Sequence, residues 1–217
     1  MARMRVGVLI SGRGSNLKAL IDAARDPNYP AEIVTVISNR PEAQGLEYAE
    51  EAGIPNEAID HTLFAGRPGF EGAVSETLRE AEVDLVCLAG FMRVLTADFI
   101  ERWRERLINV HPSLLPAFPG LHTHAGAIAA GVKISGCTVH YVSEKVDSGP
   151  IIGQAAVPVF STDTADALAA RVLNAEHRLY PHCLALVAQG RTRIVGHAVR
   201  IAGKPESEPI LLNPAEE

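Results

Sequence analysis

The sequence is poor in aromatic residues and cysteine, and it has no excess of basic charge. Aromatic residues make up 5% of the chain and include a single tryptophan. We therefore expect a core built mainly from aliphatic side chains. Lys and Arg number 20 against 26 Asp and Glu, for a formal net charge of −6. Because a protein that binds duplex nucleic acid needs a basic face, we expect no nucleic-acid partner.

The three cysteines, Cys87, Cys137 and Cys183, lie far apart and never in CxxC spacing. This pattern offers neither a disulfide framework nor a zinc site. It is typical of a reducing compartment, so we expect a cytoplasmic protein. No apolar run approaches the roughly 18 residues that a membrane helix needs, and we expect no membrane partner.

The rest of the composition is that of an ordinary globular chain. Hydrophobic residues make up 47% and charged residues 21% of the 217 residues, enough for one larger-than-average domain. The 18 glycines and 14 prolines are spread along the chain, and no repeat or linker divides it. We predict a single domain over residues 1–203 and a loose tail, rich in Pro and Glu, over 204–217.

Apolar strand patterns alternate with helical patterns along the chain. Strands are predicted at 5–11, 32–38, 57–59, 85–89 and 107–110, followed by 138–142 and 153–159. Helices are predicted from a cap at Ser15, at 42–52, 71–81, 97–104 and 122–130, and from a cap at Thr162 over about 164–189. Strands that are apolar throughout are typical of a parallel sheet covered on both faces. We predict an α/β fold with a single doubly wound, mostly parallel, Rossmann-like sheet, helices on both faces and late antiparallel strands.

A glycine-bearing loop, Ser11 to Asn16, follows the first predicted strand and leads into a helix. Glycines let the backbone approach a ligand, and a helix N-terminus offers unpaired N–H groups to an anion. The dinucleotide fingerprint GxGxxG would need glycine where Leu17 stands, and the Gly-Lys-Ser/Thr of a P-loop is absent. On the residues alone, a phosphate site and a tight turn without a ligand are equally supported.

Polar residues also stand where two later strands end. Asn109 and His111 are two residues apart, so an extended segment projects them from the same face, and together they could both donate to one oxygen. Asp147 lies in a turn after a strand. Each of the three has a purely structural alternative, as a capping Asn, a hydrogen-bonded His or a turn Asp. His122 and His124 lack a third ligand at suitable spacing, so we expect no metal site.

Taken together, these motifs resemble the phosphoribosylglycinamide formyltransferases, the folate-dependent glycinamide ribonucleotide transformylases of purine synthesis. The resemblance runs from VLISGRGSNLKALI at Val8 through ISNR at Ile37, LAGFMRVL at Leu88 and INVHPSLLPAFPGLHTHAGAI at Ile108 to Gly149-Pro150, and on to Glu176, His177, Tyr180 and Pro181. The segment NVHPSLLP with a later DxGP is shared with the wider group of formyl-folate transferases and hydrolases. SGxGSN points to the ribonucleotide enzymes.

The resemblance implies the site residues and the chemistry. The catalytic residues would be Asn109, His111 and Asp147. The ribonucleotide would be bound by Gly14, Ser15, Asn16 and Glu176. The folate would be bound by Arg67, Met92, Arg93, Val94, Leu95 and His140. The amine of glycinamide ribonucleotide would attack the formyl carbon of the co-substrate 10-formyltetrahydrofolate directly, with no metal required. Asn109 and a cationic His111 would stabilise the oxygen, and Asp147 would hold His111 and take the amine proton. The bond between Leu115 and Pro116 would be cis.

Three alternatives compete with this interpretation. Formyltetrahydrofolate deformylase shares the Asn, His and Asp but normally carries a regulatory domain first, and here the first strand is expected at Arg5. Methionyl-tRNA formyltransferase would need a basic RNA-binding domain. A non-catalytic domain that binds a phosphate ligand would need no such trio. We expect an enzyme with small-molecule substrates, as a monomer or homodimer.

Overall fold

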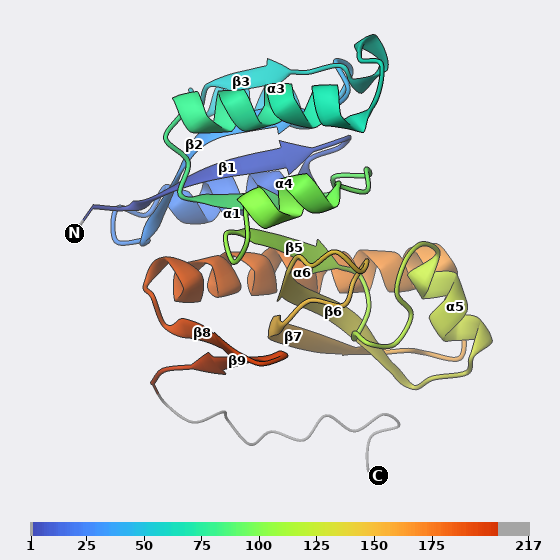
Figure 1. Ribbon diagram of the computed structural model, residues 1–217. Helices are drawn as coiled ribbons and strands as arrows, with labels where there is room; N and C mark the ends of the chain where they lie inside the picture. The colour runs from blue at the N-terminus through green and yellow to red at the C-terminus, as the bar shows by residue number, and fades with distance from the viewer. Residues whose placement is uncertain (1, 204–217) are drawn as a thin grey trace. The chain divides into compact units, whose positions relative to one another are not determined.

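The computed structural model describes residues 2–203 (Figure 1). Within this range the contacts divide the chain into two compact units. The first unit comprises residues 2–109 and 141–144, and the second comprises 110–140 and 145–203. Along this described range, no helix combines the length and apolar character that crossing a membrane requires.

Parallel strands form the centre of the first unit. They are β1 (Met4–Ile10), β2 (Ala31–Ser38), β3 (Asn56–Ala58), β4 (Leu85–Leu88) and β5 (Leu107–His111), whose last two residues belong to the second unit. β1 pairs in parallel with both β2 and β4, β2 pairs with β3, and β4 pairs with β5. All four residues of β4 are buried, as expected for a strand covered on both faces.

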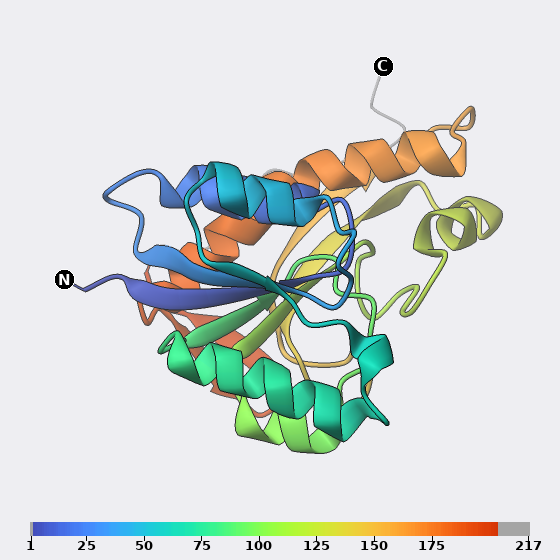
Figure 2. The same ribbon diagram turned by 90° about the horizontal axis from the view of Figure 1, so that it is seen from above.

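Helices cover both faces of these strands. α1 (Ser15–Ala24) and α2 (Gly45–Glu51) lie on one face, and α3 (Arg67–Glu80) and α4 (Ala97–Arg102) lie on the other, as Figure 2 shows. A short 3-10 helix, η1 (His61–Leu63), precedes α3. One face is closed by a core of buried side chains from α3, α4 and the strands, among them Leu9, Ile37, Phe70, Val74, Leu78, Val86, Phe99 and Trp103.

The second unit contains α5 (Thr123–Ala129), β6 (Ile134–Tyr141), β7 (Ile151–Pro158), the long helix α6 (Ala165–Ala188) and a hairpin of β8 (Thr192–Val195) and β9 (Ala198–Ile201). β6 and β7 are antiparallel, and α6 packs on β7 and α5. The core here is small and aliphatic: Ala127, Cys137, Val157, Val159, Leu168 and Val172.

The strand order confirms the predicted fold class. The large sheet follows the order β3-β2-β1-β4-β5-β6-β7, and the hairpin forms a second sheet. The sheet is mostly parallel, and its last strand, β7, is antiparallel to β6, as predicted. In the first unit the order reverses between β1 and β4, and open α/β sheets bind ligands at the carboxyl ends of strands on either side of such a switch point.

Two predicted helix caps are wrong. Ser15 is the first helical residue of α1, and the cap position belongs to Gly14, whose φ of 72° is left-handed. The last helix is capped by Thr164, whose hydroxyl accepts the Ala167 N–H at 3.1 Å, and not by Thr162.

Two further differences concern the start of α3 and a hairpin that was not predicted. Arg67, which lies before the helix predicted at 71–81, is the first residue of α3. Pro68 follows in the first turn and suits the helix because its missing N–H is not needed there. The β8–β9 hairpin had no counterpart among the predicted elements. The predicted tail, 204–217, lies outside the described residues.

Candidate active site

The loop after β1 is built around glycine. A Cβ on Gly14 would lie 2.5 Å from the Gly45 Cα, so the loop and the start of α2 are in backbone contact. The Gly45 N–H donates to the Gly12 carbonyl at 3.0 Å. This contact places the exposed Arg13 outside and leaves Ser15 and Asn16 in the first turn of α1. Their N–H groups and the helix dipole suit an anion such as a phosphate.

The loop after β4 is the second feature of the first unit. Met92 and Val94 are exposed, Arg93 is half-buried with its guanidinium 5.7 Å from the centre of the Phe70 ring, and Leu95 is buried. The Met92 N–H donates to the Ser11 hydroxyl at 2.8 Å. Because β1 and β4 are neighbours in the sheet, the loops that carry the predicted ribonucleotide and folate residues follow adjacent strands. Arg67 is exposed at the start of α3.

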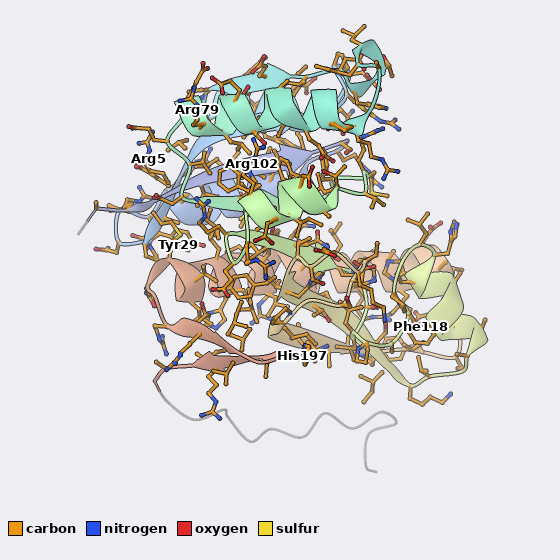
Figure 3. The ribbon with its side chains drawn as sticks, in the orientation of Figure 1. Arg5, Tyr29, Arg79, Arg102, Phe118 and His197 are labelled. Atoms are coloured by element: carbon orange, nitrogen blue, oxygen red, sulfur yellow. The ribbon has the colours of Figure 1, made fainter. Side chains whose placement is uncertain are left out.

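His111 and Asp147 are brought together within the second unit. The His111 Nδ1 lies 3.4 Å from the Asp147 Oδ2, and the two side chains are only 7% and 10% exposed. On the other side of the ring, His111 Nε2 is 3.1 Å from the carbonyl oxygen of Phe118, a residue shown on the loop before α5 in Figure 3. Both neighbours are acceptors, so a ring with a hydrogen on each nitrogen satisfies both contacts.

The Asp147 carboxylate is held from two further directions. Its Oδ2 accepts the Gly120 N–H at 2.8 Å, and its Oδ1 lies 4.0 Å from His140 Nε2. Its backbone adopts φ 51°, a conformation that is uncommon for residues other than glycine. The side chain is thus aimed by its surroundings at the cost of local backbone strain, a feature often found at functional sites.

The remaining predicted residues of the second unit are also buried. The ring of His140, expected beside the folate, lies next to Asp147, at an irregularity of the β6–β7 register. Glu176 is buried on α6. Burial raises the pKa of the Cys137 thiol to about 12, and the Glu176 carboxylate adds to this effect. Burial likewise lowers the pKa of His124, and His111 adds to it.

Asn109 lies on β5, where it stands opposite Leu88 of β4 in the parallel register, and His111 is the last residue of the strand. The loop that follows is fixed by Thr138, whose hydroxyl donates to the Ser113 carbonyl at 2.7 Å and accepts the Leu115 N–H at 3.0 Å. The bond between Leu115 and Pro116 is cis, as the resemblance implied.

Ionisable side chains do not gather into a metal site in the described part of the chain. Among residues 2–203 there is no group of three or more His, Cys, Asp or Glu side chains that could hold a metal ion.

Several residues that shape these loops were missed by sequence reasoning. Ser11 and Asn39 form a buried hydrogen-bonded pair, and Glu71 binds Thr96 at the end of the second loop. Ser11 and Asn39 stand inside the motifs SGRGSN and ISNR, but nothing in either motif indicates that the two meet. Glu71 belongs to no motif.

Comparison with known proteins agrees with this arrangement. The formyl transferase family matches residues 4–184. The chain is 41% identical to the phosphoribosylglycinamide formyltransferase of Escherichia coli strain K12, over 93% of this chain and 95% of that protein. It is 51% identical to the trifunctional purine biosynthetic protein adenosine-3 of Bos taurus, over 88% of this chain but 19% of that protein. The chain therefore spans about a fifth of the length of this larger relative.

Solved structures give the same result. A glycinamide ribonucleotide transformylase 1 from Symbiobacterium toebii is similar with a TM-score of 0.90 and 48% identity, over 92% of this chain and 94% of that one. A formyltetrahydrofolate deformylase from Pseudomonas syringae is similar with a TM-score of 0.85 but 26% identity, over 92% of this chain and 66% of that one. The family resemblance stated from the motifs is thereby confirmed: the chain belongs to the formyl transferase family.

Proposed function

We propose that this protein transfers the formyl group of 10-formyltetrahydrofolate to the amine of glycinamide ribonucleotide. The observation that carries the proposal is the buried pair of His111 and Asp147 at the end of β5, 3.4 Å apart. It lies in a chain that covers nearly the whole length of a phosphoribosylglycinamide formyltransferase at 41% identity. The folate is a co-substrate, and all binding partners in this proposal are small molecules. A single formyltransferase domain over residues 1–203 belongs to the same proposal.

The reaction needs no nucleophile from the protein. The amine nitrogen forms a bond to the formyl carbon, and charge develops on the formyl oxygen. Asn109 donates a hydrogen bond to this oxygen, and His111 donates its Nε2–H, which has to leave the Phe118 carbonyl to do so. Asp147 takes a proton from the amine, directly or through one water. The bond between the formyl carbon and the folate nitrogen then breaks, and that nitrogen receives a proton from His111.

Substrate binding follows from the two loops of the first unit. Gly14, Ser15 and Asn16 would bind the phosphate of the ribonucleotide, because backbone N–H groups and a helix dipole meet there. Glu176 would contact the ribose or amine. The folate would lie along four residues of the loop after β4, Met92, Arg93, Val94 and Leu95. Arg67 and His140 would be further contacts.

The test is the release of tetrahydrofolate from 10-formyltetrahydrofolate with and without glycinamide ribonucleotide. We expect release only with the ribonucleotide, and a fall in kcat of roughly 100-fold or more in Asp147→Asn, the range typical of a general acid or base. Asp166→Asn, which changes an exposed carboxylate in the first turn of α6, is the matched control and should keep full activity.

Two other outcomes would overturn the proposal. Release that needs no ribonucleotide would identify a deformylase, which shares this fold. Tight binding of the ribonucleotide without any turnover would identify a binding domain.

A further inference from the structure

Ser11 lies at the end of β1 and is buried, with 7% of its surface exposed. Its hydroxyl contacts two segments that are distant in sequence. It accepts the Met92 N–H at 2.8 Å from the loop after β4, and it donates to the Oδ1 of Asn39 at the end of β2. A hydroxyl has one hydrogen to donate and lone pairs to accept. Both bonds can therefore form together, and the Ser11 side chain joins the ends of three strands.

Asn39 extends this connection to the segment before α3. It is buried, with its side-chain Nδ2 3.1 Å and its backbone carbonyl oxygen 2.9 Å from the Nδ1 of His61. His61 is the first residue of η1, and its ring meets the Phe70 ring edge-on. The orientation of Ser11 is therefore fixed by a residue that is itself held in place.

The segment Met92–Leu95, in which Met92 and Val94 are exposed, is held at both ends by buried side chains. Ser11 binds the N–H of its first residue. At the far end, the Thr96 N–H donates to Glu71 Oε1 at 2.9 Å, and the Thr96 hydroxyl donates to the other carboxylate oxygen. Met92 and Val94 point outward between these anchors. The segment is thus presented to a ligand in a conformation that Ser11 and Glu71 determine.

We propose that Ser11 is a positioning residue that couples the two substrate loops to each other. It is the first residue of the glycine loop, Ser11 to Asn16, and it holds the first residue of the segment 92–95, across the switch point between β1 and β4. A phosphate that orders the first loop therefore orders the second, and the effect is reciprocal, as linkage requires. The identity of the two ligands rests on the proposed function.

Four variants separate this role from a general loss of structure. Ser11→Ala removes both hydrogen bonds, and Ser11→Thr keeps the hydroxyl. Glu71→Gln weakens the hydrogen bonds that hold the far end of the segment 92–95 and changes no contact of the glycine loop. Ser75→Ala is the matched control, because Ser75 is as buried as Ser11, at 7%, and lies two turns beyond Arg67 in α3.

The kinetic expectation is a split between KM and kcat. In Ser11→Ala the KM for each substrate should rise by about 3- to 10-fold, the usual effect of one lost hydrogen bond, because the bond to Met92 is lost at one loop and the bond to Asn39 beside the other. The kcat should stay within about twofold of the wild-type value. Ser11→Thr should restore both values. Glu71→Gln should raise the KM for the folate alone, and Ser75→Ala should change neither. A rise in only one KM in Ser11→Ala would overturn the coupling.

Hydrogen–deuterium exchange tests the coupling without any turnover. Without ligands, the backbone amides of the peptide that contains Met92 should exchange faster in Ser11→Ala than in the wild-type protein. Glycinamide ribonucleotide, or inorganic phosphate in its place, should slow exchange of residues 89–96 in the original protein and in Ser75→Ala, but not in Ser11→Ala. If this pattern holds while no formyl transfer occurs, the proposed function fails and the coupling stands. Exchange of 89–96 that ignores both ligands, or that responds equally in Ser11→Ala, would overturn the coupling.

Discussion

Gly14 allows the sharpest test of the glycine loop, because two physical costs meet at this residue. Its φ of 72° is a left-handed conformation, which costs a residue with a Cβ about 1–2 kcal/mol. In addition, a Cβ would lie 2.5 Å from the Gly45 Cα, whereas two carbon atoms pack best at about 3.5–4.0 Å. The loop and the start of α2 would have to separate by about 1 Å.

The two costs add to a predicted magnitude for Gly14→Ala. Overpacking of this kind typically costs about 1–3 kcal/mol, so the free energy of unfolding should fall by about 2–5 kcal/mol in total. With a urea slope of about 2 kcal/mol per molar, the midpoint should fall by about 1–2.5 M. Because the displaced residues include those proposed to bind phosphate, the KM for the ribonucleotide should rise as well.

Two other glycines, Gly53 and Gly12, provide the controls for the urea unfolding measurement. Gly53 is also left-handed, at φ 68°, but a Cβ there meets nothing within 4 Å, so Gly53→Ala should show the backbone cost of about 1–2 kcal/mol alone. Gly12 has open space and no positive φ, so Gly12→Ala should leave stability nearly unchanged. If Gly14→Ala and Gly53→Ala were equally destabilising, the contact with Gly45 would not constrain the loop.

Two other predictions concern an ion pair in the second unit and the cysteines of both units. Asp163 binds Arg171 through both carboxylate oxygens, and these hydrogen bonds lower the pKa of Asp163 from 3.8 to about 2. A lowered pKa contributes stability that is complete above about pH 4 and lost as the pH falls through 2, so the urea midpoints of the original and Asp163→Asn should differ at pH 6 and converge near pH 2. A difference that stays constant with pH would contradict this account. All three cysteines are buried, and burial raises the pKa of Cys137 and Cys183 to about 12. A thiol reagent at pH 8 should therefore label three thiols in urea but react far more slowly with the folded protein. Rapid labelling of the folded protein would refute the burial.

Those parts of the fold that depend on burial could be predicted from sequence. The run Leu85–Leu88 is apolar at every position and forms a central strand buried on both faces. Because such runs alternate with segments of helical spacing, the strands were predicted to be parallel. In the second unit, the long helix was predicted to within two residues of its observed bounds, because its buried positions repeat over many turns.

The errors fall where local chemistry allows more than one solution. Ser15 is a good helix cap by residue type, but only Gly14 can take the left-handed turn in contact with Gly45. Thr162 and Thr164 are equivalent as caps in sequence. Thr164 takes the role because the Asp163 carboxylate accepts the Phe160 N–H and binds Arg171, which orients the turn before α6.

The β8–β9 hairpin escaped prediction for a different reason. Its strands are only four residues long, and none of their residues is fully buried. Arg193 stands directly opposite Arg200 in the register, a like-charged pair that works against pairing. No hydrophobic pattern of useful length remains for a sequence argument to detect.

The residues of the candidate site also divide into those that local sequence features predict and those that they do not. Strand ends and glycine turns are local features, so the position of Asn109 and His111 at the end of a strand and of Gly14 before a helix could be predicted. Polar contacts between distant segments leave no periodic pattern. The bond from Met92 to Ser11 spans 81 residues, and neither residue is unusual in its own neighbourhood. The motif SGRGSN therefore contains two kinds of residue: Ser11 faces back into the protein and binds the neighbouring strand ends, whereas the residues from Gly14 onward begin the helix whose N–H groups suit an anion. A motif match alone does not distinguish the two, but their hydrogen-bond partners do.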